Sequence, residues 1–116
     1  MSLTTNVSQP DFPDLVLDTN VNQIPVIDVF RGIANMEYVE AKNPHATAAY
    51  LQVFDTLSVT MGTTTPVMEV RLAGLTTVHI KCSVGFSKGV SYGATSTAGG
   101  AIIPAGVITL KIMGAV

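Results

Sequence analysis

This chain contains unusually few charged residues. Only 12% of its 116 residues are charged, against roughly 25% in typical soluble domains, whereas 47% are apolar. The six Lys and Arg residues are scattered and are outnumbered by eight Asp and Glu residues. Because nucleic-acid binding depends on clustered cations, no nucleic-acid partner is expected. The surface of such a chain must consist of uncharged polar groups or be covered by other subunits. This favours either a homo-oligomer (a dimer or trimer) or a subunit bound to other proteins.

Cysteine and aromatic residues are also scarce. Cys82 is the only cysteine, so an intramolecular disulfide is excluded. Three Tyr, four Phe and no Trp weaken a sugar-binding or base-stacking role, because both depend on aromatic platforms. The first six residues lack the cationic and apolar regions of a signal peptide. Glycine, proline and lysine interrupt the apolar tail from residue 98, so no membrane span is expected.

What the sequence does contain is the two-residue period of half-buried β-strands, from residue 26 onward. The clearest run is 76–84, in which Thr76, Val78, Ile80, Cys82 and Val84 share one face. Further strands are expected around 34–38, 50–55, 68–72 and 108–112. In the first of these, Ala34, Met36 and Tyr38 should oppose Asn35 and Glu37. Both faces of 50–55 are largely apolar, as in a central strand or one with a face in an interface.

Glycine, proline and asparagine fall between these runs, and no helical period of useful length separates them. The sequence therefore predicts an all-β fold with one small antiparallel β-sandwich, jelly-roll-like or Ig-like, over residues 26–116. Six or seven strands are expected there.

Residues 1–25 are predicted to form an extended N-terminal arm, because they contain three prolines and no sustained period. Two placements are open: the arm docks on a neighbouring subunit, or it packs along its own domain as an edge strand. For docking, the expected partner-binding residues are acidic groups and apolar anchors, namely Asp11, Asp14, Asp18, Leu15, Val16, Leu17 and Val21.

Candidate chemistry is sparse. His79 and Cys82 are three residues apart on a strand and point to opposite faces, so they cannot bind one metal ion. His45 lies in a turn without a neighbouring carboxylate, and no Gly-x-Ser-x-Gly elbow occurs. The glycine-rich run 89–95 lacks the ending of a phosphate loop and is expected to be a strand that another backbone approaches closely. No catalytic residue, metal site or cofactor is predicted, and the chain is not expected to be an enzyme.

Five blocks occur in an order that resembles a group of small β-sandwich structural proteins of tailed bacteriophages. They are Gly32-Ile33-Ala34-Asn35, Asn43-Pro44, Tyr50-Leu51-Gln52-Val53-Phe54-Asp55, Gly62-Thr63-Thr64-Thr65-Pro66 and Gly85-Phe86-Ser87-Lys88-Gly89-Val90. The similarity covers roughly residues 32–97 and leaves the arm outside. One departure is Ala73, which stands where proline would be expected in a hairpin at Arg71–Leu75.

The resemblance implies a virion structural protein, either a capsid decoration (cement) protein or a tail, baseplate or fibre subunit. A cement protein would sit on the outer capsid surface after assembly in the host cytoplasm. Its partners would be the major capsid protein or other virion subunits. A small hydrolase or sugar-binding module is the remaining alternative, and it would need a pocket that joins His79 or His45 to an acid.

Overall fold

The computed structural model describes residues 14–31 and 34–115. All regular structure in these ranges is β-strand, and no helix there is long and apolar enough to cross a membrane. The strands are β1 (Asp14–Val21), β2 (Val26–Arg31), β3 (Ala34–Asn43), β4 (Ala49–Asp55), β5 (Met68–Leu72), β6 (Thr76–Phe86), β7 (Gly89–Thr95) and β8 (Ile108–Ala115).

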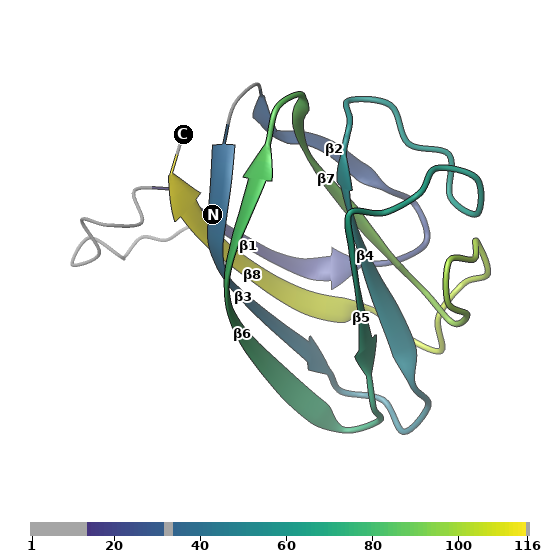
Figure 1. Ribbon diagram of the computed structural model, residues 1–116. Helices are drawn as coiled ribbons and strands as arrows, with labels where there is room; N and C mark the ends of the chain where they lie inside the picture. The colour runs from purple at the N-terminus through teal and green to yellow at the C-terminus, as the bar shows by residue number, and fades with distance from the viewer. Residues whose placement is uncertain (1–13, 32–33, 116) are drawn as a thin grey trace.

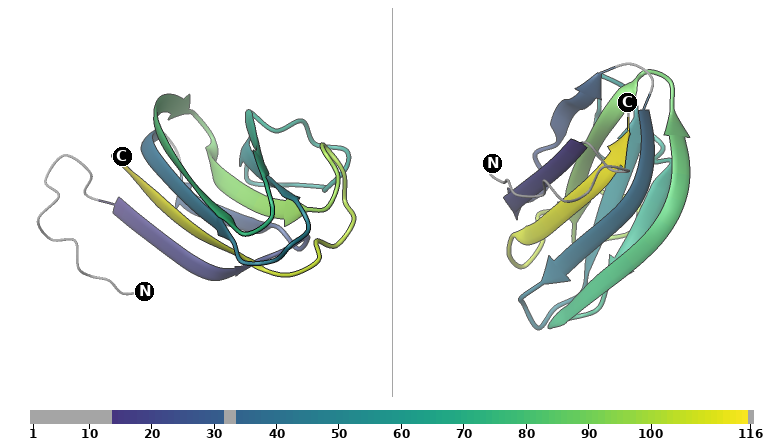
Figure 2. Two further views of the ribbon diagram at one scale, coloured as in Figure 1. Left: turned by 90° about the horizontal axis from the view of Figure 1, so that it is seen from below. Right: turned by 90° about the vertical axis from the view of Figure 1, so that its left-hand side faces the viewer.

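The eight strands form two four-stranded antiparallel sheets that pack face to face (Figure 1). Sheet A has the order β1-β8-β3-β6, seen side by side in the right view of Figure 2, and sheet B has the order β2-β7-β4-β5. Strand 1 pairs with 8, 2 with 7, 3 with 6 and 4 with 5. This is the pairing of one long hairpin rolled into two sheets, the jelly roll. The predicted β-sandwich is confirmed, and of its two forms the jelly roll is the one observed.

The second half of the predicted arm belongs to the sandwich. Residues 14–21 form β1, an edge strand that pairs with β8 from Asp14↔Gly114 to Val21↔Ile108. For these residues the structure shows the edge-strand placement. The rest of the arm, residues 1–13, lies outside the described residues.

The core lies between the sheets and is formed by buried apolar side chains of β1, β3, β4, β5, β6, β7 and β8. In β6 the predicted alternation is confirmed from Val78 to Val84, which are partly buried and alternate with exposed His79, Lys81 and Ser83. β4 lies between β7 and β5, which explains why both of its faces are apolar. β7 is buried along its whole length, as expected for a strand that other segments approach closely.

The predicted face of β3 is wrong after its third residue. The pairing of β3 with both neighbours shifts register between Met36 and Tyr38. Met36 and Val39 are both fully buried, so Tyr38 lies on the outer face rather than sharing the inner face with Met36. An extra residue at such a bulge reverses the alternation that follows it.

The expected hairpin at Arg71–Leu75 is also corrected. β5 belongs to sheet B and β6 to sheet A, so the turn between them crosses from one sheet to the other. A Cβ at Gly74 would lie 2.0 Å from the carbonyl oxygen of Ala46, and the Leu75 N–H donates to His45 O at 2.8 Å. The close packing of this turn against the β3–β4 turn requires glycine at position 74.

Candidate assembly surface

Three of the segments that contain no charged residue lie together in the fold. They are residues 19–27, which include the corner between β1 and β2, the β4–β5 loop at 56–67, and the β7–β8 loop at 96–107. In Figure 1 the teal β4–β5 loop and the yellow-green β7–β8 loop lie at the right, beside the purple corner. We call these three segments the uncharged loop surface.

The segments touch one another. A Cβ at Gly93 in β7 would lie 3.0 Å from Met61 Cε and 3.4 Å from the carbonyl oxygen of Asn22, so the β4–β5 loop and the β1–β2 corner both lie against β7 at Gly93. A Cβ at Gly62 would lie 3.2 Å from Ala101 Cβ, which places the β4–β5 loop against the β7–β8 loop. The uncharged loop surface is therefore continuous.

Large apolar side chains point outward from this surface. Of the ten large hydrophobic residues that are exposed in the described part of the chain, eight belong to it. The most exposed are Ile24 at 68%, Ile103 at 64% and Ile102 at 59%. The others are Val26, Ile27, Leu57, Val67 and Val107. Concentrated exposure of this kind is typical of interaction surfaces, whereas single exposed hydrophobic residues are ordinary.

Hydrogen bonds to sheet B hold the β7–β8 loop in place. The fully buried Gln52 amide donates to Thr95 Oγ1 at 2.9 Å and to Gly100 O at 3.2 Å. Thr95 in turn donates to Thr97 O at 2.7 Å. Glu69 on β5 accepts from the Gly99 N–H at 2.5 Å. The loop is therefore hydrogen-bonded to two strands of sheet B, the central strand β4 through Gln52 and the edge strand β5 through Glu69.

The β4–β5 loop has its own ties. The Thr60 N–H donates to Thr64 Oγ1 at 2.9 Å, and the Thr64 N–H donates back to Thr60 O at the same distance. Ser91 donates to Thr56 O at 2.7 Å from β7 beneath the loop. The loop folds back so that the Val67 N–H donates to Val53 O at 2.8 Å. Each loop thus presents its aliphatic side chains from a fixed backbone.

The outer face of sheet A has the opposite character. The Tyr38 hydroxyl donates to Glu40 Oε1 at 2.9 Å and lies 2.8 Å from His79 Nδ1, while Lys111 Nζ lies 4.0 Å from Glu40 Oε1. Burial, followed by the hydrogen bond and the charge of Glu40, raises the pKa of the Tyr38 phenol. Asn35 donates to Glu37 and, at 3.5 Å, to Ser83 Oγ on the same face. Charged groups thus gather on this face, whereas at the uncharged loop surface the exposed Glu69 carboxylate lies at the border, where it accepts from the Gly99 N–H.

The arm residues predicted to bind a partner have different environments. Val21 is 1% exposed and packs in the core of its own domain, which corrects its expected role as an anchor. Asp18 accepts from the Tyr92 hydroxyl at 2.7 Å, and Leu17 is 41% exposed. Burial, followed by the hydrogen bond to Asp18, raises the pKa of Tyr92. Asp14, Leu15 and Val16 pair along β8, and Asp11 lies outside the described residues.

The residues considered for metal or catalytic chemistry are not brought together. Within residues 14–31 and 34–115, no three His, Cys, Asp or Glu side chains form a metal-binding group. Cys82 points inward and donates to Met36 O at 3.6 Å, and burial followed by the charge of Glu37 raises its pKa. His45 packs against Gly106. His79 does meet an acid, at 3.4 Å from Glu40, but on an exposed sheet face.

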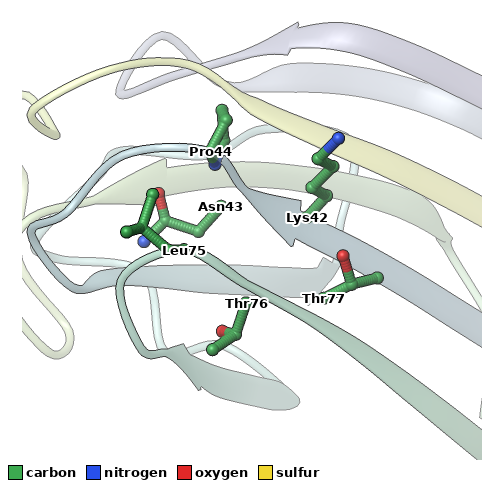
Figure 3. Close-up of a pocket in the computed structure, with 6 residues that line it drawn as sticks. All are labelled: Lys42, Asn43, Pro44, Leu75, Thr76 and Thr77. Atoms are coloured by element: carbon green, nitrogen blue, oxygen red, sulfur yellow. The ribbon is translucent and has the colours of Figure 1, made fainter.

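A hollow of about 300 Å³ lies beside the β3–β4 and β5–β6 turns (Figure 3). Its lining consists of Lys42, Asn43, Pro44, Leu75, Thr76 and Thr77. Neither His45 nor His79 is in this lining, so the hollow does not supply the histidine and acid pocket that a hydrolase would need. The buried Asn43 amide beneath it donates to Thr47 O at 2.9 Å and to Leu72 O at 3.1 Å, which joins the two turns.

Two of the blocks that carry the resemblance contact each other. Asp55, at the end of β4, accepts hydrogen bonds from the backbone N–H groups of Ser87, Lys88 and Gly89, the shortest being 2.9 Å from Lys88. These bonds, led by that from Lys88, lower the pKa of Asp55 against a smaller opposing effect of burial. The sequence motif thus serves to fasten the turn between β6 and β7.

No family model, curated protein or solved structure matches this chain.

Proposed function

We propose that this protein is a structural subunit of a tailed-phage virion and, within that class, a decoration protein that binds the outer capsid surface. The observation that carries the proposal is the uncharged loop surface, whose exposed aliphatic side chains suit a protein that works by association. The order of the sequence blocks supports the phage setting. Jelly rolls are common among capsid proteins, but the fold also serves lectins and cupins and does not decide the function.

Attachment through several weak contacts would suit such a subunit. Residues 1–13 are joined in sequence to Asp14, the first residue of β1, which is an edge strand of sheet A. A tether at the rim makes each further contact on the capsid intramolecular, which raises the overall affinity by about 10² to 10⁴ without a new interface on the sandwich.

The test is a binding assay with virions of the encoding phage that have been stripped of this protein. Deletion of residues 1–13 removes the tether and leaves β1 intact, whereas a longer deletion would remove core residue Val21. We expect the full chain to bind in hundreds of copies per particle and the deletion variant to bind about 100-fold more weakly. An unchanged thermal unfolding midpoint would show that the variant is folded.

Each other result has a definite meaning. Full occupancy by the deletion variant refutes the tether. Binding of only a handful of copies refutes decoration and favours the tail, baseplate or fibre alternative. No association of the full chain with any part of the virion refutes the structural role altogether.

A further inference from the structure

We infer that the uncharged loop surface is the contact between copies of this chain, so that the protein forms a closed homo-oligomer through it. The inference rests on the proposed function in treating this surface as an association surface, and it adds the identity of the occupant. Three properties of the surface favour a second copy over a different protein: its charge, its hydrogen-bonding groups and its rigidity.

The first property is the complete lack of charge over residues 19–27, 56–67 and 96–107. In a symmetric contact the same patch meets itself, so a charge near the axis faces an identical charge on the other copy. Like charges brought together in this way oppose association. Charge reaches only the border of this surface, where the Gly99 N–H holds the Glu69 carboxylate, whereas the outer face of sheet A carries Glu40, His79 and Lys111 and would suit a partner with complementary charges.

The second property is the kind of polar group that surrounds the aliphatic side chains. Exposed threonines, including Thr60, Thr63, Thr65 and Thr97, supply hydroxyl groups. A hydroxyl both donates and accepts, so it can pair with the same hydroxyl of another copy. An ammonium only donates and a carboxylate only accepts, so neither can pair with itself. The polar groups present are thus the self-complementary ones.

The third property is rigidity. The hydrogen bonds from Gln52 and Glu69 to the β7–β8 loop, and those between Thr60 and Thr64, exist within one copy. Association is opposed by the entropy that is lost when mobile loops become ordered at an interface. Here the loops are already ordered in the folded monomer, so this entropy is not lost again when two copies associate. Ile24, Ile102 and Ile103 have few rotamers to lose, and apolar area of this kind is typical of homodimer interfaces.

The test is the mass of the purified full chain in solution, measured by sedimentation velocity over about 1 to 100 µM. Ile103→Asp places a charge within the surface without disturbing the core, because Ile103 is 64% exposed. Leu75→Asp is the matched control: Leu75 is 71% exposed, lies outside the surface, and has a φ of 58° that aspartate tolerates better than leucine. We expect the wild type and the control to form the same oligomer, and Ile103→Asp to dissociate at least about 100-fold more readily.

A second variant, Ile24→Asp, tests the same surface from the β1–β2 corner and guards against a folding defect in Ile103→Asp. A monomeric wild type, an oligomer that survives both variants, or equal disruption by Leu75→Asp would overturn the inference. The virion assay separates the two proposals. A monomer whose particle binding is lost in Ile103→Asp means that the capsid occupies the surface, which overturns the inference and keeps the proposed function. An oligomer that binds no particle supports the inference and overturns the proposed function.

Discussion

At the scale of single residues, the carboxylate of Asp55 fastens the turn between β6 and β7. It accepts three backbone N–H groups and the Ser87 hydroxyl, and these donors lie from 32 to 34 residues further along the chain. The sequence shows Asp55 at the end of a strand motif but not what it binds, because its partners are brought to it only when β6 crosses from sheet A to β7 in sheet B. A contact of this range cannot be predicted from local patterns.

Asp55→Asn should therefore make folding less stable in a pH-dependent way. The folded protein holds the Asp55 pKa below its ordinary value, so the stabilisation is present above the unfolded pKa of about 3.9 and is lost as pH falls through the lower folded pKa. Because the carboxylate is partly exposed to solvent, we expect the variant to lose only about 1 kcal/mol at neutral pH. Urea unfolding at neutral pH and below pH ~3 should show this difference shrinking in acid.

Ser87→Ala is the companion variant, because it removes one hydroxyl and leaves the three backbone donors in place. It should keep the pH dependence of the wild type. If Asp55→Asn loses as much stability in acid as at neutral pH, the carboxylate charge is not what fastens the turn.

At the scale of strands, period-two patterns predict an element well where its pairing is regular. β6, β5 and β8 follow their expected alternation, and the two apolar faces of β4 correctly indicate a central strand. The prediction fails where pairing geometry intervenes. The register shift in β3 turns Tyr38 outward, and its cause lies in the fit of β3 to β6 and β8 together. The sequence of residues 34–38 alone does not indicate where this register shift occurs.

β1 is the strand whose attachment can be tested most directly. Tyr92 is almost fully buried in sheet B, and its hydroxyl reaches Asp18 on β1 in sheet A at 2.7 Å. Tyr92→Phe keeps the ring in the core and removes only this link, so we expect a loss of about 1 kcal/mol in unfolding free energy. Amide hydrogen exchange should become faster in β1 around residues 18–21, while β6 should keep its protection.

Tyr50→Phe provides the control, since Tyr50 lies on β4 in the same sheet but on its outer face. It should leave exchange in β1 unchanged. Equal acceleration in both variants, or none in Tyr92→Phe, would mean that β1 is held by its pairing with β8 and not by the link to Tyr92.

At the scale of the whole molecule, the candidate surface is visible in the sequence only in part. Three stretches without charge can be read directly from residues 19–27, 56–67 and 96–107. Their convergence depends on the pairing of β1 with β8 and of β2 with β7, which brings the β1–β2 corner and the β7–β8 loop to one end of the sandwich. The pairs that decide this are the most distant in sequence, and pairing over such distances leaves no periodic signature.

The same order of pairing predicts how the molecule folds. Among the described strand pairs, only β4 and β5 are consecutive in sequence, and each further pair of the rolled hairpin closes a longer loop. Because loop closure opposes early long-range contacts, the β4–β5 pair should form first and β1–β8 last, in a slow reaction of about milliseconds to seconds.

Leu51 in β4 and Leu110 in β8 are both fully buried, so Leu→Ala at either should lower stability by about 2 to 5 kcal/mol. In stopped-flow urea experiments Leu51→Ala should mainly slow folding, and Leu110→Ala should mainly speed unfolding. If Leu110→Ala slows folding as much as Leu51→Ala does, the two ends of the chain meet before the rate-limiting step and the rolling order is wrong.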